Sequence, residues 1–568
     1  MILLDPHNLE KPYQDARSRE VMEKTIAFFE RKGKKKLLED YYSFEWYGDF
    51  VDYVRENRLF ATMSTPSGYG ADDSRWDTWR ICEFAEILGF YGLQYWYVWQ
   101  VSVLGLGPIW MSANEEVKQK TAGLLEDGGI FAFGLSERAH GADIYSTDMR
   151  LKVLDEGRYE ASGSKYYIGN GNKASIVSTF GRFGAEGEDG DYVFFAAESD
   201  HENYHLIRNV VASQNYVSSF ELRDYPLTEA DILHKGKEAF YAALNTVNVG
   251  KFNLGWASIG ICTHALYEAI RHSSNRILYG NPVTEMSHVR KMFVDAWVRL
   301  VAMKLFALRS ADYMRAASPE DRRYLLFNPM TKMKVTTQGE EVINLLWDAI
   351  AAKGFERDQY FSQAAIDIRA LPKLEGTVHV NIALLVKFMP NYFFAPADLE
   401  PVAQQNAPVN DDFLFDQGPA RGLSEIRFHD YAKAFALFDT PNVALFREKT
   451  EKFKAMLADL PPTEEQSRDA DYLLAGGQIF ALVVYGQLIC ENAEIYGLDT
   501  DLVDEIFDVL CRDFSRYAME LHDKPGTTAA QMERCLGMLA RPEPDAARYD
   551  RIWREHVEPL RDGYVMPE

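Results

Sequence analysis

Glu375 is the acidic residue whose sequence neighbours point most directly to chemistry. It stands in the run Leu374-Glu375-Gly376-Thr377. In an apolar, water-poor cleft the pKa of a carboxyl group rises, so Glu375 could act as a general base beside a hydrocarbon chain. Gly376 would let the backbone approach a bound molecule closely, because glycine has no Cβ. Taken alone, the run also fits an ordinary carboxylate at the start of a helix.

Three further stretches could supply the other groups that such a reaction needs. They are Phe131–Asp143, Gly163–Ala174 and Gly250–Gly280. Runs of β-branched and aromatic residues, separated by Gly, Asp and Asn turns, surround the first two stretches. The third lies in sequence with helical periodicity. A site that uses all of them must therefore combine a small β module with helices.

The pattern of the sequence divides the chain into five segments. Residues 1–130 have helical periodicity and form an N-terminal helical domain, and residues 131–240 form a small middle β domain. Helical periodicity returns in residues 241–394, which contain Glu375. Residues 395–429 are a proline-rich linker, and residues 430–568 form an additional helical domain.

Composition limits the class of protein and its partners. The chain has 568 residues, 47% of them hydrophobic, and a net charge of −24. Such a charge disfavours nucleic acid and anionic membranes as partners. The five cysteines form no CxxC pair, which indicates reduced thiols in a cytoplasmic protein and no metal site. The apolar run Leu473–Cys490 contains Gln478 and Gln487, so we expect a buried bundle helix and no stable membrane insertion.

Five short blocks carry a resemblance to a known family. In chain order they are Phe133–Glu137 followed by Gly141–Asp143, then Gly163–Ala174, Phe220–Leu233, Arg276–Gly280 and Leu374–Thr377. In this order they resemble the acyl-CoA dehydrogenase family over about residues 60 to 390. The resemblance implies an α+β fold that is mostly α. It comprises an N-terminal helical domain, a small middle β-barrel domain, a C-terminal four-helix bundle and, in this long form, the additional C-terminal helical domain.

The resemblance also implies a reaction, the FAD-dependent α,β-dehydrogenation of an acyl-CoA thioester to the trans-2-enoyl-CoA. Glu375 would remove the proton from the α carbon while flavin N5 takes the hydride from the β carbon. Some family members place the base near Asn248–Lys251. No carboxylate occurs there in this chain, so Glu375 is the one candidate.

Matched positions give the expected cofactor and substrate residues. Phe133, Leu135 and Ser136 would line the pyrimidine side of the isoalloxazine, and Arg276 with Tyr279 would meet the FAD pyrophosphate of a neighbouring subunit. The remaining cofactor positions are Tyr167, Gly169, Ala351, Ala352, Gly376, Thr377 and His379, and the expected substrate positions are Ala142, Asn248, Lys251 and Leu374.

Several of these positions depart from the family pattern. Tyr167 replaces a Trp that packs on the flavin, and Gly169 replaces a Thr whose hydroxyl bonds N5. Ala351 and Ala352 replace two glycines of a loop near the diphosphate. Ala142 replaces a Ser that contacts the coenzyme A moiety. These departures leave the flavin potential and the details of substrate binding open.

Three functions remain possible. The leading hypothesis is an acyl-CoA dehydrogenase that passes electrons to an electron-transfer flavoprotein, in fatty acid metabolism and β-oxidation. The second is an acyl-CoA oxidase reoxidised by O₂, although the Gly163–Ala174 block is closer to the dehydrogenase form. The third is a flavin-binding scaffold without turnover, which the retention of Glu375 argues against. The family implies a homodimer or homotetramer.

Overall fold

The computed structural model describes residues 3–141, 143–155, 157–185, 190–419 and 421–568. Its internal contacts divide the chain into two compact units. We call them the sheet unit and the bundle unit. The sheet unit contains Leu9–Asn253, Asn406–Arg421 and Met566–Glu568, and the bundle unit contains residues 3–8, Leu254–Gln405 and Gly422–Val565. The boundary divides the proline-rich linker, because its middle packs in the sheet unit while both ends pack in the bundle unit.

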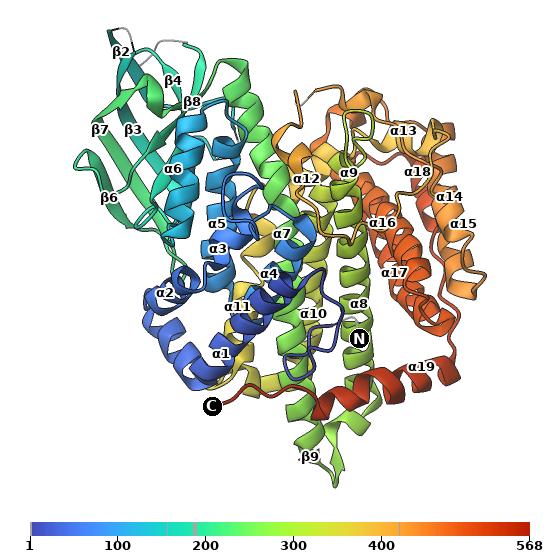
Figure 1. Ribbon diagram of the computed structural model, residues 1–568. Helices are drawn as coiled ribbons and strands as arrows, with labels where there is room; N and C mark the ends of the chain where they lie inside the picture. Colours follow the sequence, from blue (N-terminus) through green and yellow to red (C-terminus); the bar gives the residue numbers. More distant parts are fainter. Residues whose placement is uncertain (1–2, 142, 156, 186–189, 420) are drawn as a thin grey trace. The chain divides into compact units, whose positions relative to one another are not determined.

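The sheet unit begins with helices that bury aromatic side chains. Every residue of helix α5 (Leu93–Trp110) is buried, as expected for a helix that is hydrophobic on all sides. Asp77 caps helix α4 (Thr78–Tyr91) by accepting hydrogen bonds from the backbone N–H groups of Trp79 and Arg80. The other helices are α1 (Ala16–Ser43), α2 (Gly48–Glu56), α3 (Leu59–Ser64) and α6 (Glu115–Glu126) (Figure 1).

An eight-stranded sheet follows these helices in the same unit. Seven strands form a path in the order β6-β7-β3-β2-β4-β5-β8, and β1 pairs in parallel with β4. The long strands β3 and β7 are antiparallel, with a register shift between Tyr166 and Ile168. The strands are β1 (Phe131–Gly134), β2 (Arg150–Asp155), β3 (Arg158–Gly169), β4 (Ile176–Phe183), β5 (Tyr192–Ala197), β6 (Tyr204–Asn209), β7 (Val217–Thr228) and β8 (Ile232–Lys235) (Figure 1).

Long helices build the bundle unit. Helix α7 (Lys237–Asn275) begins in the sheet unit and continues into the bundle unit, where helices α8 and α10 pack against each other. The short strands β9 (Ile277–Leu278) and β10 (Asn281–Pro282) form a hairpin. The other helices of this part are α8 (Ser287–Arg315), α9 (Tyr324–Met330), α10 (Thr336–Ile350), α11 (Tyr360–Asp367), α12 (Val378–Leu385) and α13 (Met389–Phe394).

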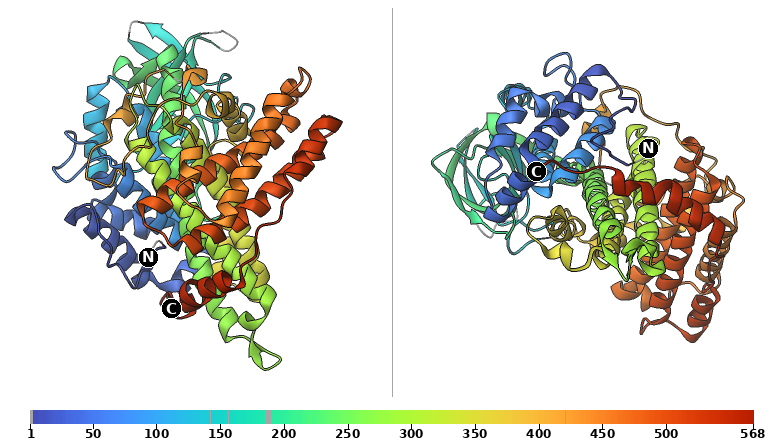
Figure 2. Two further views of the ribbon diagram at one scale, coloured as in Figure 1. Left: turned by 90° about the vertical axis from the view of Figure 1, so that its right-hand side faces the viewer. Right: turned by 90° about the horizontal axis from the view of Figure 1, so that it is seen from below.

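Residues 430–568 add further helices to the bundle unit. Helix α16 (Ala470–Ile495) packs along α17 (Thr500–His522), and both views of Figure 2 show them side by side. By length and composition α16 could cross a membrane, but 78% of its most apolar window is buried inside the protein. A buried bundle helix, as the sequence predicts, explains that composition. The remaining helices are α14 (Ala432–Phe435), α15 (Pro441–Asp459), α18 (Ala529–Gly537) and α19 (Ala546–Ile552).

Candidate active site

Strand β1, which carries Phe133, is placed by a close approach of helix α5. A Cβ at Gly105 of α5 would lie 2.6 Å from the backbone N of Ala132, so only glycine permits this separation. The carbonyl of Gly105 accepts a hydrogen bond from Ser178 Oγ at 2.6 Å. Helix α5 and strands β1 and β4 are therefore held against one another at Gly105.

Asn170 completes the support of β1. Its side chain is fully buried, and its Nδ2 donates to Val98 O at 3.0 Å and to Phe131 O at 2.9 Å. Ser102 Oγ accepts from the backbone N of Phe131 at 3.1 Å. Asn170 has φ +59, a left-handed conformation that asparagine tolerates better than most residues. It joins the end of β3 to β1 and α5.

A buried ion pair fixes the segment that follows β1. Lys165 Nζ on β3 lies 2.6 Å from Glu137 Oε1, and the two side chains are 0% and 5% exposed. Burial raises the pKa of Glu137, but the Lys165 ammonium and hydrogen bonds from Thr147 and Asp148 outweigh that effect and lower it. The backbone N of Tyr166 donates to Ser136 O at 3.0 Å. Glu137 and Lys165 stand inside the quoted sequence blocks, whereas Thr147 and Asp148 lie outside them, and the sequence assigned none of the four a role.

The expected flavin residues of the sheet unit lie close together on β1, its continuation and β3. Phe133, Leu135 and Ser136 are half-buried. Tyr167 is 61% exposed and has φ +64 at the irregular register of β3. A Cβ at Gly169 would lie 2.6 Å from Val101 Cγ2 and 2.7 Å from Tyr97 Cε1. The tight contact with α5 explains why the usual threonine is replaced here by glycine.

The expected substrate residues of the same unit lie on helix α7. Asn248 is half-buried and Lys251 is 9% exposed. Gln100 of α5 donates to the carbonyl of Gly250 at 3.1 Å and accepts from Asn253 at 2.9 Å. This pair of bonds fixes α7 beside α5. Ala142 lies outside the described residues.

Glu375 occupies a strained turn in the bundle unit. It has φ +52 and is followed by Gly376 with φ +86. The left-handed conformation costs a residue with a side chain about 1 kcal/mol or more. Glu375 is half-buried, and its Oε2 is shielded from solvent. Thr377 then caps helix α12 by accepting from the backbone N of Val380. Leu374, Gly376, Thr377 and His379 surround Glu375 in sequence, and His379 is exposed.

Two buried side chains hold this turn. Lys332 Nζ donates to Pro372 O at 2.7 Å and also to Gly376 O. Asn381 Nδ2 donates to the same Gly376 carbonyl at 3.2 Å and to Thr377 O at 2.9 Å. Sequence reasoning missed both residues, because neither stands in a matched block.

Arg276 and Tyr279 lie together at an exposed hairpin of the bundle unit. Tyr279 has φ +52 and Gly280 φ +85, the two successive positive angles that a two-residue hairpin turn requires. The side chain of Tyr279 is 95% exposed and that of Ile277 57% exposed. The hairpin therefore presents aromatic, aliphatic and cationic groups outward.

Ala351 and Ala352 follow helix α10 in the bundle unit. Ala351 has φ 58 and ψ −138, a conformation that glycine readily adopts and alanine does not. Ala351 therefore has a backbone suited to the glycine that the family resemblance implies at this position.

The predicted site residues therefore form two groups. The sheet unit holds Phe133, Leu135, Ser136, Tyr167, Gly169, Asn248 and Lys251. The bundle unit holds Arg276, Tyr279, Ala351, Ala352, Leu374, Glu375, Gly376, Thr377 and His379. Within the bundle unit the expected residues stand at three places: the β9–β10 hairpin, the end of helix α10 and the turn before helix α12. The joining of both groups into one active site stays a prediction.

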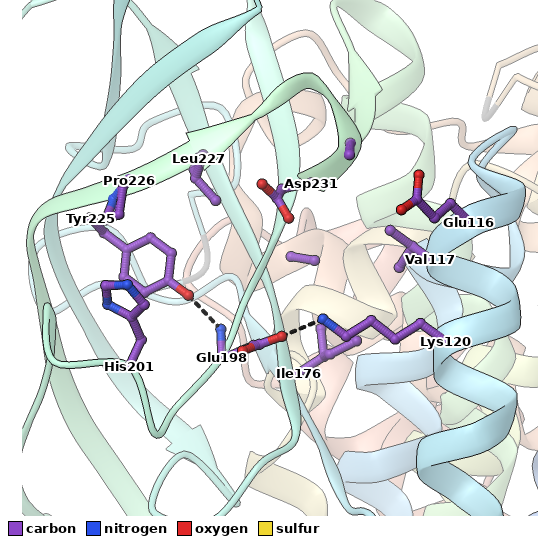
Figure 3. A pocket seen from close by; sticks show the side chains of 12 residues that line it. Glu116, Val117, Lys120, Ile176, Glu198, His201, Tyr225, Pro226, Leu227 and Asp231 are labelled. Atoms are coloured by element: carbon purple, nitrogen blue, oxygen red, sulfur yellow. Dashed lines mark hydrogen bonds and ion pairs between the residues drawn. The ribbon is translucent and has the colours of Figure 1, made fainter.

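A cavity of about 230 Å³ lies elsewhere in the sheet unit, between helix α6 and the sheet. Figure 3 shows Lys120 paired with Glu198, and the hydroxyl of Tyr225 accepting from the backbone N of Glu198 at 2.9 Å. The rings of His201 and Tyr225 are in contact at a tilt of 48°, with 4.5 Å between their centroids. Among the residues that the structure describes, none of the expected flavin or substrate positions lines this cavity.

A trio of possible metal ligands also lies in the sheet unit. Ligand atoms of Glu137, His140 and Asp148 lie within 4.8 Å of one another. The carboxylate of Glu137 is already neutralised by Lys165. That engagement makes it a poor metal ligand, and we assign no metal here.

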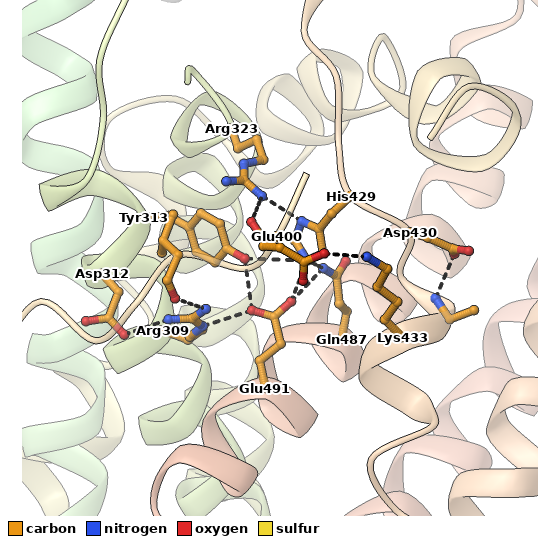
Figure 4. A network of polar contacts seen from close by, with 12 residues as sticks. Arg309, Asp312, Tyr313, Arg323, Glu400, His429, Asp430, Lys433, Gln487 and Glu491 are labelled. Atoms are coloured by element: carbon orange, nitrogen blue, oxygen red, sulfur yellow. Dashed lines mark hydrogen bonds and ion pairs between the residues drawn. The ribbon is translucent and has the colours of Figure 1, made fainter. Parts of the chain in front are cut away.

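A buried polar network joins the linker end to helices α8 and α16 within the bundle unit (Figure 4). Glu491 of α16 accepts from Arg309 Nε at 2.8 Å and from Tyr313 OH at 2.9 Å, and lies 2.8 Å from His429 Nε2. Burial raises the pKa of Glu491, but hydrogen bonds and charge from His429 and Arg309 lower it to about 2. Glu491 is therefore held as a buried carboxylate.

Comparisons with known proteins agree on one family. Residues 238–389 match the family "Acyl-CoA dehydrogenase, C-terminal domain". The chain is 23% identical over 295 residues to an acyl-CoA dehydrogenase of Bacillus subtilis, covering 50% of this chain and 75% of that one. It is 25% identical over 290 residues to the short-chain-specific acyl-CoA dehydrogenase of Megasphaera elsdenii, covering 48% of this chain and 72% of that one.

A solved structure resembles the fold over nearly the whole length. It is an acyl-CoA dehydrogenase complexed with FAD from Bacillus anthracis, with a TM-score of 0.75 at 14% identity. The match covers 98% of this chain and 97% of that chain. It therefore includes the helices after residue 430, which confirms the expected fold class with its additional helical region.

Proposed function

We propose that this chain, which belongs to the acyl-CoA dehydrogenase family, oxidises an acyl-CoA thioester to the trans-2-enoyl-CoA with Glu375 as the base. It is an oxidoreductase of that family, and its cofactor is FAD. The observation that carries the proposal is the turn at Glu375, because it lies within the matched residues 238–389 and is held by buried donors.

The residues of the sheet unit suit a flat, partly apolar ring. Phe133 and Leu135 are half-buried and leave apolar surface available, and Tyr167 adds an exposed aromatic plane. The backbone of β1 is rigid because Gly105 and Asn170 fix it. At Gly169 no side-chain hydroxyl is possible, so only backbone groups can meet the cofactor there.

The bound FAD supplies the acceptor for the substrate's β-hydride. Glu375 receives the α-proton, so that one proton and one hydride leave the substrate and a carbon–carbon double bond forms. The strained backbone at Glu375 is of the kind found at functional sites. Lys251, buried on α7 of the sheet unit, would supply a positive charge suited to the acyl-CoA.

We further propose an electron-transfer flavoprotein as electron acceptor, a homodimer or homotetramer, and a cytoplasmic location. The 95% exposed Tyr279 and its neighbour Arg276 support contact with another molecule at the hairpin. Fatty acid β-oxidation is the proposed setting.

Anaerobic flavin bleaching tests the function. We expect the yellow protein to bleach with an acyl-CoA within a series of graded chain length. In Glu375→Gln the bleaching rate should fall by roughly 10³-fold or more, because the amide accepts no proton, while FAD stays bound. Asp358→Asn, at an exposed acid of the same unit, should bleach at the wild-type rate.

Two outcomes would contradict the proposal. Unchanged bleaching in Glu375→Gln would exclude this residue as the base, and a wild type inert to every acyl-CoA would exclude the reaction. Stoichiometric O₂ consumption during turnover would instead identify the oxidase.

A further inference from the structure

Lys332 lies beneath the turn that carries Glu375. Lys332 is 0% exposed. Its ammonium donates hydrogen bonds to two backbone carbonyls, that of Pro372, three residues before Glu375, and that of Gly376, one residue after it. Charge-assisted hydrogen bonds are about twice as strong as neutral ones. The two bonds therefore hold the backbone on both sides of the candidate base.

The turn needs such support because its backbone is strained. Glu375 is in the left-handed region, where residues other than glycine persist only when their surroundings fix them. Asn381, 1% exposed, adds two donors from inside helix α12, one of them to the same Gly376 carbonyl. Of Lys332 and Asn381, which both donate hydrogen bonds to the turn, Lys332 is the one that carries a charge.

Local structure places Lys332 in that position. It belongs to the π-helical segment Thr331–Val335, between helices α9 and α10. Such widened turns are rare and occur often at functional sites. A Cβ at Gly255 of helix α7 would lie 2.7 Å from Thr331 Cγ2, so close packing fixes the beginning of the segment.

We propose that Lys332 is a positioning residue, whose ammonium fixes the turn so that the Glu375 carboxylate is aimed for proton removal. This inference deepens the proposed function and depends on it. A displacement of about 1 Å at a reacting group can cost a rate factor of about 100.

The same segment offers a matched control. Lys334 is also 0% exposed, two residues further along, but its Nζ donates to Tyr517 OH at 3.1 Å on helix α17. Lys332→Met and Lys334→Met each remove one buried ammonium from the π-helical segment. Only the first removes donors from the Glu375 turn.

The experiment measures flavin bleaching at saturating acyl-CoA, the apparent substrate affinity, FAD content and Tm in both variants. For Lys332→Met we expect the limiting rate to fall by about 10- to 100-fold with FAD retained and affinity little changed. Lys334→Met should stay within about 2-fold of the wild-type rate.

Several outcomes would overturn the inference. Equal rate losses in both variants, or a loss explained by missing FAD, would make Lys332 merely structural. If Lys332→Met does not fold, Lys332→Arg decides the question: it keeps the charge but shifts the donors, so an unchanged rate would refute positioning. A wild type that never bleaches would remove the proposed function itself, whereas a bleaching wild type with an unaffected Lys332→Met removes only this inference.

Discussion

Ala351 adopts a backbone conformation that its side chain disfavours. With φ 58 and ψ −138 at the end of helix α10, it has a conformation suited to glycine. Residues held in such regions cost about 1–3 kcal/mol each. The family pattern has glycine at this point, so the alanine here retains the turn at the expense of local strain.

Replacing this alanine by glycine should stabilise the protein. In Ala351→Gly the relief of strain exceeds the added backbone entropy of the unfolded chain, and we expect a gain of about 1 kcal/mol in the free energy of unfolding. Ala352→Gly is the control, because Ala352 has a negative φ in the following 3₁₀ turn and should lose about 0.5–1 kcal/mol. Urea unfolding measures both, and destabilisation by Ala351→Gly would contradict the strain argument.

Helix α5 packs against strand β1, which carries the expected flavin residue Phe133. Their separation is set by Gly105, whose absent Cβ would lie 2.6 Å from Ala132 N and 2.9 Å from Ala132 C. Backbone atoms cannot move away as a flexible side chain can. The position of Phe133 therefore depends on a glycine in another element.

Gly105→Ala should consequently weaken both folding and cofactor binding. Overpacking of this kind costs about 1–3 kcal/mol, and the shift of β1 should lower the FAD content of the purified protein. Gly123 on helix α6 is the control, because a Cβ there meets nothing within 4 Å. Gly123→Ala should keep its FAD and gain up to about 1 kcal/mol from helix propensity. Full FAD occupancy and unchanged Tm in Gly105→Ala would refute the close-approach argument.

Across the bundle unit, the linker end and the C-terminal helices are joined by the carboxylate of Glu491. Arg309 and Arg323 bring two buried guanidinium groups to this network, and Arg323 Nη1 bonds His429 Nδ1 at 2.8 Å. Breaking a buried charge pair by removing one partner typically costs about 3–5 kcal/mol. The residues after 430 should therefore unfold together with the bundle.

Stability should fall in acid because of this carboxylate. The pKa of Glu491 is lowered from its ordinary 4.5 to about 2 in the folded protein. Its contribution, roughly 3 kcal/mol, is therefore fully present above about pH 4.5 and is lost as the pH falls toward 2. This contribution is measured by comparing the free energies of unfolding of the wild type and Glu491→Gln between pH 7 and pH 3.

Glu491→Gln should be less stable than the wild type at pH 7, and the difference between their free energies of unfolding should shrink as the pH falls. Glu494→Gln, at an exposed acid on the same helix, should follow the wild type at every pH. A difference between wild type and Glu491→Gln that does not change with pH would contradict the assignment.

Much of the fold and part of the site could be predicted from the sequence. Helical periodicity, turn residues and the five short blocks are local patterns, so the helix, sheet and helix order and the candidate base Glu375 follow from them. The blocks also contain Lys165 and Asn170, whose structural roles no pattern revealed. Their partners, Glu137 in the segment after β1 and Val98 on α5, are chosen by packing across the sheet unit.

By itself the sequence determined which segments form helices or strands and which acid could serve as the base, because those properties depend on neighbours along the chain. The tertiary structure decided what holds that acid. Lys332 stands 44 residues before Gly376, and no spacing rule pairs them. Only the folded chain brings an ammonium to those carbonyls, because contacts between distant segments depend on how all the intervening elements pack.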